Sequence, residues 1–286
     1  MPVLRNQPQK RCRIFALGVP VLDMLDMPSI LGQYTWHMTN KKIAILQTGQ
    51  PIKEALEKYG DFDALFIKAM GLDKSQTKTI RVYDDLDFPK VDELAGVLIT
   101  GSPSMVTECN LWCQKTQQWI KQFMQTDMPV LGVCYGHQLL AQVLGGTVSW
   151  NPKGREMGQV DMLVTAAAHT DALLGSVVND ATVSIKVQAT HQQAVTFLPD
   201  EVTILGQTKL DSHHCFCYKN HVWGLQFHPE FSPDIIKDYI RLRYEDVESE
   251  GLEPNKMIAD IEDINHGTAI LQRFAQICFS GLQTHN

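Results

Sequence analysis

One cysteine of this sequence lies where a catalytic nucleophile is expected. The segment Gly132-Val133-Cys134-Tyr135-Gly136-His137-Gln138 joins an apolar run to a stretch with helical periodicity. Glycines two positions away on either side of Cys134 permit a sharp strand-to-helix turn, which presents the side chain at the edge of a sheet. A helix N-terminus there favours the thiolate, the reactive form of cysteine. The alternative is a buried cysteine that only packs, which is common for this residue type.

A general base and an acid that orients it follow much later in the chain. In Gln226-Phe227-His228-Pro229-Glu230, which ends an apolar run, side chains two positions apart point to the same side. His228 and Glu230 can therefore lie together, with the carboxylate holding the imidazole in its working tautomer. A single histidine is more often structural than catalytic. An elbow cysteine combined with this pair predicts a Cys134–His228–Glu230 triad.

A tight turn is predicted at Ile99-Thr100-Gly101-Ser102-Pro103, directly after a strand. Backbone N–H groups near Ser102 could meet that of Tyr135 and bind the oxyanion of a tetrahedral intermediate. Gly-Ser-Pro is also ordinary turn chemistry, so this signal is weak by itself.

These three pieces, in this order and spacing, resemble class I glutamine amidotransferases, particularly stand-alone proteins similar to the glutaminase domain of GMP synthase. The resemblance covers about residues 41–232. It implies Cys134 as nucleophile, His228 as general base and then acid, Glu230 as its orienter, and the amides of Ser102 and Tyr135 as the oxyanion hole. It also implies a set of residues around the substrate: Gly101, Gln138, Arg155, Glu156, Met157, His191 and Gln193.

The sequence departs from the GMP synthase branch at His191-Gln192-Gln193. That branch has His-x-Asp here, and its carboxylate grips the α-amino group of glutamine. With the neutral Gln193, binding of free glutamine would lose a charge-assisted hydrogen bond worth about 1 to 3 kcal/mol. The change leaves the bond-breaking residues intact and opens the question of the substrate.

The favoured function is cleavage of the γ-amide of glutamine through a cysteinyl γ-glutamyl thioester, with release of ammonia to water or to a separate synthetase chain. The chemistry requires no metal and no cofactor. The sequence has no Gly-x-x-x-x-Gly-Lys-Ser/Thr loop, so acceptor chemistry that needs ATP must occur elsewhere. Two alternatives remain: a γ-glutamyl peptidase or hydrolase, and a non-catalytic regulatory protein with the same fold.

Two other cysteine-containing segments are interpreted as structural. His213-His214-Cys215-Phe216-Cys217 contains metal-ligand residue types, but its cysteines have strand spacing beside an apolar run and no second pair lies nearby at zinc spacing. Cys109 and Cys113, at the start of a helical stretch, are likewise expected to pack.

The elements that position these residues predict an α/β fold. Apolar runs at Ile43–Leu46, Gly96–Thr100 and Pro129–Val133 alternate with helical stretches, which indicates a parallel sheet with helices on both faces. Shorter runs from Thr147 to Gln226 predict antiparallel strands, the last two joined by a turn at Lys219-Asn220. The expected fold, in agreement with the resemblance, is flavodoxin-like with a mainly parallel sheet and an antiparallel addition.

Composition bounds the remaining questions. We expect residues 1–40 to form an N-terminal extension, whose order the sequence leaves open, 41–232 to form the catalytic domain, and 233–286 to form a helical extension that packs on it. A net charge of -7 argues against a nucleic-acid partner. No apolar run is long enough to span a bilayer, and seven scattered cysteines fit a reducing cytoplasm.

Overall fold

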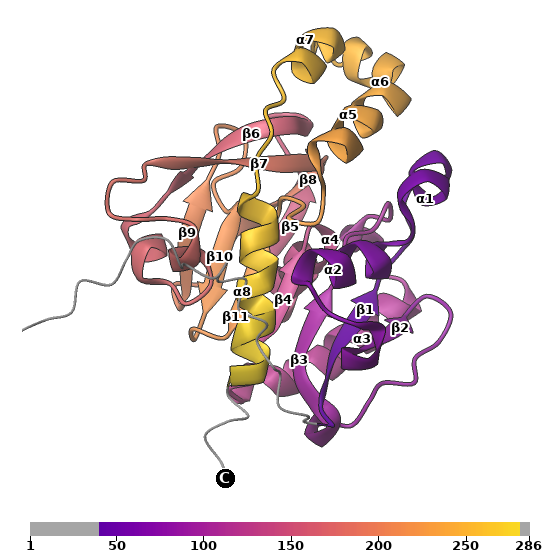
Figure 1. Ribbon diagram of the computed structural model, residues 1–286, viewed down its shortest axis with the longest axis vertical. Helices are drawn as coiled ribbons and strands as arrows, with labels where there is room; N and C mark the ends of the chain where they lie inside the picture. Colours follow the sequence, from indigo (N-terminus) through magenta and orange to yellow (C-terminus); the bar gives the residue numbers. More distant parts are fainter. Residues whose placement is uncertain (1–39, 281–286) are drawn as a thin grey trace, which may run out of the picture. The chain divides into compact units, whose positions relative to one another are not determined.

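A nine-stranded mixed sheet forms the centre of the protein in the computed structural model, which describes residues 40–280 (Figure 1). The predicted N-terminal extension lies outside these residues except for Asn40. The strand order is β2-β1-β3-β4-β11-β10-β9-β6-β7.

The first five strands of this order are parallel. They are β2 (Thr77–Arg81), β1 (Lys42–Gln47), β3 (Leu94–Ile99), β4 (Val130–Val133) and β11 (Val222–Leu225). Every residue of β3, β4 and β11 is buried, as expected for parallel strands covered on both faces. The predicted parallel core is confirmed.

The remaining strands continue the sheet in antiparallel fashion. They are β10 (Cys215–Tyr218), β9 (Val202–Gln207), β6 (Glu156–Val164) and β7 (Ser184–His191). Lys219 and Asn220 have φ values of 50° and 58°, the left-handed backbone of a tight hairpin, so the turn between β10 and β11 is where the sequence predicted it. A separate pair consists of β5 (Thr147–Trp150) and β8 (Gln193–Phe197), and β8 was not predicted.

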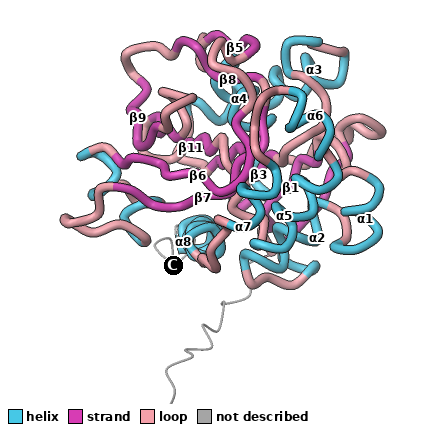
Figure 2. The backbone as a smooth tube through the Cα atoms, turned by 90° about the horizontal axis from the view of Figure 1, so that it is seen from above, coloured by secondary structure: helices cyan, strands magenta, loops and turns pink. Residues whose placement is uncertain are grey.

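Helices lie on both sides of the sheet (Figure 2). On one side are α3 (Leu111–Ile120) and α4 (Tyr135–Val143), and on the other α2 (Phe62–Met70) and α8 (His266–Ser280). The predicted α/β class with a mixed sheet is therefore confirmed. Helix α8 buries Ile270, Leu271 and Phe274 completely, so this C-terminal segment contributes to the core.

The other helices lie toward the end of the sheet that carries the site described below. They are α1 (Lys53–Tyr59), α5 (Pro233–Leu242), α6 (Tyr244–Ser249) and α7 (Pro254–Ala259). Ser232 caps α5, its hydroxyl accepting from the Ile235 amide, with Pro233 in the first turn. Helices α6 and α7 were not predicted. Figure 1 shows α5 to α7 gathered above β6 and β7.

Short 3₁₀ turns complete the elements, at Lys74–Gln76, Val91–Glu93, Val106–Glu108, Lys121–Gln125, Ala166–Thr170 and Leu174–Ser176. No helix in the described part of the chain is long and apolar enough to cross a membrane.

Candidate active site

Three neighbouring strand ends bring the predicted catalytic segments together. Because β3, β4 and β11 are adjacent and parallel, the segments that follow them emerge at the same edge of the sheet. Gly101 follows β3, Cys134 follows β4 and His228 follows β11. Side chains from three distant parts of the sequence thus meet where α/β proteins commonly bind ligands.

Cys134 forms a sharp turn between β4 and α4. Its backbone angles are φ 50° and ψ -100°, a conformation that non-glycine residues rarely adopt and that is often found at functional sites. The Cys134 amide donates to the Leu225 carbonyl at 2.8 Å, and the Gly136 amide donates to the Thr100 carbonyl at 3.1 Å. Hydrogen bonds to both neighbouring strand ends therefore fix the turn.

The glycines beside Cys134 are required by close backbone approach. A Cβ atom on Gly132 would overlap the backbone of Gly136, and one on Gly136 would overlap the backbone of Ile99. Helix α4 can therefore begin directly against β3 and β4 only because these positions lack a side chain. The two glycines thus permit the sharp strand-to-helix turn that was expected from the sequence around Cys134.

His228 and Glu230 form a buried hydrogen-bonded pair. The Nδ1 of His228 lies 2.7 Å from the Oε1 of Glu230, and the ring of Phe231 stacks on the imidazole at 4.2 Å between centroids. Burial by itself lowers the pKa of His228, but the Glu230 carboxylate and the charge of the Cys134 thiolate outweigh it and raise that pKa to about 10. The arrangement favours a protonated imidazole next to Cys134, and a histidine in this position is the usual partner of a thiol nucleophile.

The turn after β3 lies against both predicted catalytic side chains, Cys134 and His228. A Cβ atom on Gly101 would be 2.9 Å from the Cε1 of His228 and 3.5 Å from the Cβ of Cys134. The Ser102 hydroxyl donates to the Thr48 carbonyl at 2.9 Å, and the Thr48 hydroxyl donates to the Gly101 carbonyl at the same distance. The strand end of β1 thus holds this turn in place.

A hollow of about 80 Å³ opens beside Cys134. Ser102 and Tyr135, the two residues predicted for the oxyanion hole, line it, and Tyr135 is the first residue of α4, where an amide has no acceptor within its helix. Four residues of the predicted substrate set also line it: Gln138, Arg155, His191 and Gln193. Gly101, Glu156 and Met157 are not among its lining residues.

Polar side chains beneath the hollow are largely committed to each other. The Gln138 amide nitrogen donates to the Gln193 carbonyl at 2.9 Å and to the Gln226 side-chain oxygen at 3.0 Å. The Gln193 amide nitrogen donates to the Thr107 hydroxyl at 2.7 Å. These bonds hold the start of β8 against α4 and η3, the turn at Val106–Glu108, and so shape the hollow.

Glu156 belongs to a buried network behind the hollow. Its Oε2 lies 3.0 Å from the His191 Nε2 and 3.3 Å from the His214 Nδ1, and His214 also lies 3.4 Å from Asp211. Burial raises the pKa of Glu156, but the hydrogen bond from His191 and the neighbouring His214 and Thr208 together outweigh it, and the pKa is lowered. The ligand atoms of Glu156, His191 and His214 lie within 4.8 Å of one another, so this is the group among the described residues that could hold a metal. We interpret it as a structural network, because Glu156 is already hydrogen bonded.

The remaining cysteines fit the packing interpretation with one exception. Cys215, Cys217 and Cys113 are buried. Cys109, with a left-handed backbone at φ 46°, is exposed, so the expectation that it packs in the interior is wrong.

Two charged residues near the hollow were not predicted from the sequence, and both lie next to the C-terminal helices α5 and α6. Arg243, between α5 and α6, lines the hollow. Glu250, directly after α6, receives two hydrogen bonds from the Arg155 guanidinium, at 2.7 and 2.9 Å. Neither residue lies in a recognisable sequence motif. The partner of Glu250, Arg155, is 95 positions away in the sequence.

Comparison with known proteins agrees with this geometry. The family model described as glutamine amidotransferase class-I matches residues 54–244, more than half of the chain. The chain belongs to this family. As predicted, this class I amidotransferase is related to GMP synthase: over 136 residues it is 34% identical to GMP synthase (glutamine-hydrolyzing) of Aeropyrum pernix, covering 48% of this chain and 24% of that one.

Other similarities of this class I amidotransferase extend over more of the chain. It is 30% identical over 186 residues to gamma-glutamyl peptidase 5 of Arabidopsis thaliana, which covers 64% of this chain and 72% of that protein. The structure of a glutamine amidotransferase from Thermotoga maritima matches it with a TM-score of 0.64 and 17% identity, over 85% of this chain and 99% of that one. At this identity the structural match shows the shared fold.

Proposed function

We propose that this class I amidotransferase is a cysteine-dependent hydrolase of γ-glutamyl C–N bonds. One observation carries the proposal: the elbow cysteine and the His228–Glu230 pair, bonded at 2.7 Å, emerge at the same edge of the sheet from adjacent strands. A nucleophile, a base and a group that orients the base are the parts that covalent amide hydrolysis requires.

The proposed mechanism has two halves. His228 accepts the thiol proton of Cys134, the sulfur attacks the side-chain carbonyl carbon, and the amides of Ser102 and Tyr135 bind the resulting oxyanion. His228 then donates the proton to the leaving nitrogen, the C–N bond breaks, and a γ-glutamyl thioester remains on Cys134. In the second half His228 takes a proton from water, the hydroxide displaces the sulfur, and glutamate and the free thiol are released.

Two substrate classes remain, γ-glutamyl peptides and free glutamine. Gln193, which lines the hollow, carries no charge to offer an α-ammonium, and because both substrates carry that group, this residue does not distinguish between them. Similarity to a gamma-glutamyl peptidase supports a substituted amide as the bond cleaved. Membership of the amidotransferase family supports the second candidate, hydrolysis of glutamine with delivery of ammonia to a separate synthetase chain.

Parallel assays of two substrates test the proposal. Release of ammonia from glutamine and of the amino acid from a γ-glutamyl dipeptide is measured for the wild type, Cys134→Ala and Cys109→Ala. We expect Cys134→Ala to lower turnover at least about 1000-fold, because the nucleophile is lost. Cys109→Ala, which removes an exposed thiol, controls for general effects and is expected to keep full activity.

Labelling separates an inactive scaffold from an enzyme whose best substrate was not supplied. An electrophilic γ-glutamyl analogue is expected to modify Cys134 in the native protein and not after denaturation, as mapped by peptide mass spectrometry. No turnover of either substrate, together with no selective labelling of Cys134, would instead support the non-catalytic regulatory alternative.

A further inference from the structure

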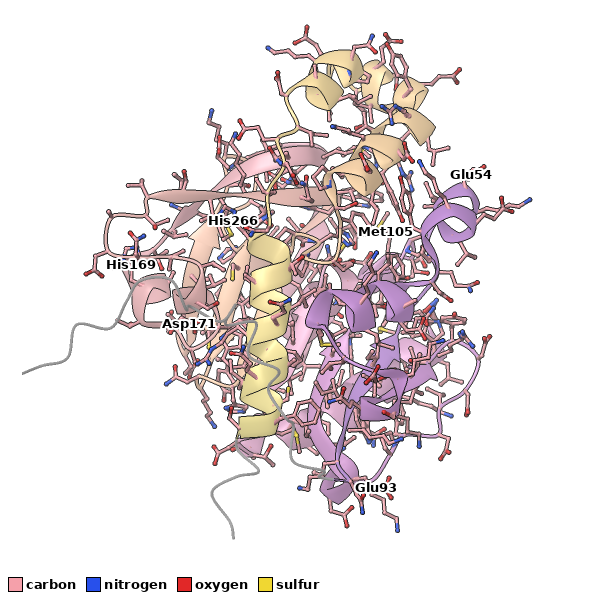
Figure 3. All side chains as sticks on the ribbon, in the orientation of Figure 1. Glu54, Glu93, Met105, His169, Asp171 and His266 are labelled. Carbon is pink, nitrogen blue, oxygen red and sulfur yellow. The ribbon has the colours of Figure 1, made fainter. Side chains whose placement is uncertain are left out.

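Two guanidinium groups lie at the hollow beside Cys134. Arg155 and Arg243 line it, and none of the described residues that line it is acidic. Its other lining residues include the apolar Met105, which is labelled in Figure 3 and lies below α5 in that view. A group bound here is therefore expected to carry negative charge.

The two arginines differ in how free they are to bind a ligand. Both oxygens of Glu250 pair with Arg155, whose side chain is only 7% exposed, so the charge of Arg155 is already compensated. Arg243 has a weaker partner, Asp246, at 4.0 Å, and its side chain is 33% exposed. A guanidinium has five N–H donors, and the contact with Asp246 is long. Arg243 can therefore donate a bidentate pair of hydrogen bonds to a carboxylate.

The geometry of the reaction indicates which part of the substrate meets Arg243. Cys134 and the predicted oxyanion residues line the hollow, whereas His228, which protonates the leaving nitrogen, does not. The acyl portion attached to the sulfur therefore occupies the hollow, and the leaving group departs on the side of His228. A γ-glutamyl acyl chain ends in an α-carbon that bears one carboxylate and one ammonium group.

The hollow offers these two groups unequal partners. The carboxylate can meet the guanidinium of Arg243. For the ammonium, Gln193 supplies a neutral acceptor, since its Oε1 is buried with no hydrogen-bond partner while its nitrogen is bonded to Thr107. A hydrogen bond with charge on both partners is stronger than one with charge on a single partner.

We propose that Arg243 is a specificity-determining residue that binds the α-carboxylate of the γ-glutamyl group, and that the α-amino group is dispensable. The substrate class is then five-carbon acyl amides with a free carboxylate at the far end, including glutaryl amides that lack the amino group. The inference rests on the proposed function and goes beyond it, because it assigns recognition to a residue from the C-terminal helices.

Three chromogenic substrates test the inference by release of p-nitroaniline. They are γ-glutamyl p-nitroanilide, glutaryl p-nitroanilide, which lacks the amino group, and the α-methyl ester of the first, which lacks the carboxylate. For the wild type we expect kcat/KM to fall less than about fivefold without the amino group and about ten- to a hundredfold without the carboxylate.

The variant Arg243→Gln is expected to lose about ten- to a hundredfold in kcat/KM on the two carboxylate-bearing substrates, mainly through KM, and to be unchanged on the ester. The matched control is Arg241→Gln, two residues earlier at the end of α5, whose guanidinium pairs with Asp238 at 2.7 Å. An equal loss on all three substrates, or a loss only when the amino group is removed, would overturn the inference.

Equilibrium binding keeps the inference testable apart from catalysis. Titration calorimetry with glutaryl p-nitroanilide on Cys134→Ala and on Cys134→Ala/Arg243→Gln is expected to show about ten- to a hundredfold weaker binding in the double variant. Equal affinities would reject the role of Arg243. If no substrate is hydrolysed by the wild type but the affinities differ, the proposed function fails and the carboxylate site stands.

Discussion

Replacing Glu230 with Gln tests whether the carboxylate holds His228 in its protonated form. The variant keeps the size of the side chain and a hydrogen-bond acceptor 2.7 Å from the imidazole, but removes the negative charge. In the wild type, burial lowers the pKa of His228, and Glu230 and Cys134 together raise it to about 10. Without the carboxylate, Cys134 alone opposes the lowering of the His228 pKa by burial.

The size of the effect follows from the hydrogen bond that loses its charge. A hydrogen bond to a charged group contributes about 1.5 to 3 kcal/mol, compared with about 1 kcal/mol for a neutral one. A difference of about 0.5 to 2 kcal/mol corresponds to a fall of about 0.4 to 1.5 in the pKa of His228, since one pKa unit equals 1.36 kcal/mol. Because the charge that is removed is buried, the effect on the pKa is larger than this hydrogen-bond difference. We therefore expect the pKa of His228 to fall by at least about 1 unit.

The assay is an NMR titration of the His228 ring, assigned by loss of its signal in His228→Gln. We expect a midpoint near 10 in the wild type and at or below about 9 in Glu230→Gln. The exposed Glu54, labelled in Figure 3, supplies the control Glu54→Gln, which should titrate as the wild type does. Equal midpoints in wild type and Glu230→Gln would refute the reasoning.

Stability gives an independent readout with a definite sign. Because the pKa of His228 is raised above its ordinary 6.5, the ion pair stabilises the folded state fully below pH 6.5 and this contribution is lost as the pH rises through about 10. Chemical denaturation between pH 6 and 10 should therefore show a smaller pH-dependent loss in Glu230→Gln than in the wild type.

Three further substitutions test the site and the fold. Gly101→Ala places a Cβ 2.9 Å from the His228 ring, so kcat should fall about ten- to a hundredfold in steady-state assays while the melting temperature changes little; an unchanged kcat would contradict the described contact. Phe274→Ala empties a fully buried position on α8 and should lower the free energy of unfolding by about 3 to 5 kcal/mol in urea, whereas the exposed Gln272→Ala should change it by less than about 0.5. Glu156→Gln removes a carboxylate whose pKa is lowered, so its stabilisation is present above pH 4.5 and lost below; the stability difference from the wild type should shrink on acidification from pH 6 to 3.

Strands of the sheet could be predicted where apolar runs were long enough to be distinctive. The apolar runs predicted at Ile43–Leu46, Gly96–Thr100 and Pro129–Val133 fall on β1, β3 and β4. β8 was missed because only one residue, Gln192, separates it from β7, so no turn signal marks the boundary between the two strands. Helices α6 and α7 have six residues each, too short for periodicity to appear, and packing on β6 and α5 stabilises them.

The site divides in the same way between local motifs and long-range packing. The predicted triad residues were recognisable because each lies in a short motif whose backbone geometry has local causes, such as the glycines around Cys134. Arg243 has no such motif. It reaches the hollow because α5 packs on β6 and β7, which depends on tertiary contacts that single-sequence patterns do not encode.

The position of β11 in the sheet has a consequence for how this enzyme tolerates change. β11 joins the parallel and antiparallel halves, and its Leu225 carbonyl binds the Cys134 amide at 2.8 Å only three residues before His228. The predicted nucleophile is therefore bonded to β11, whereas the amide of the predicted base His228 donates to the Gln188 carbonyl of β7 at 2.7 Å. Sequence changes in β7 that move Gln188 are expected to displace the imidazole relative to the sulfur, so β7 is expected to tolerate less change than β9, whose described residues make no such contact with His228.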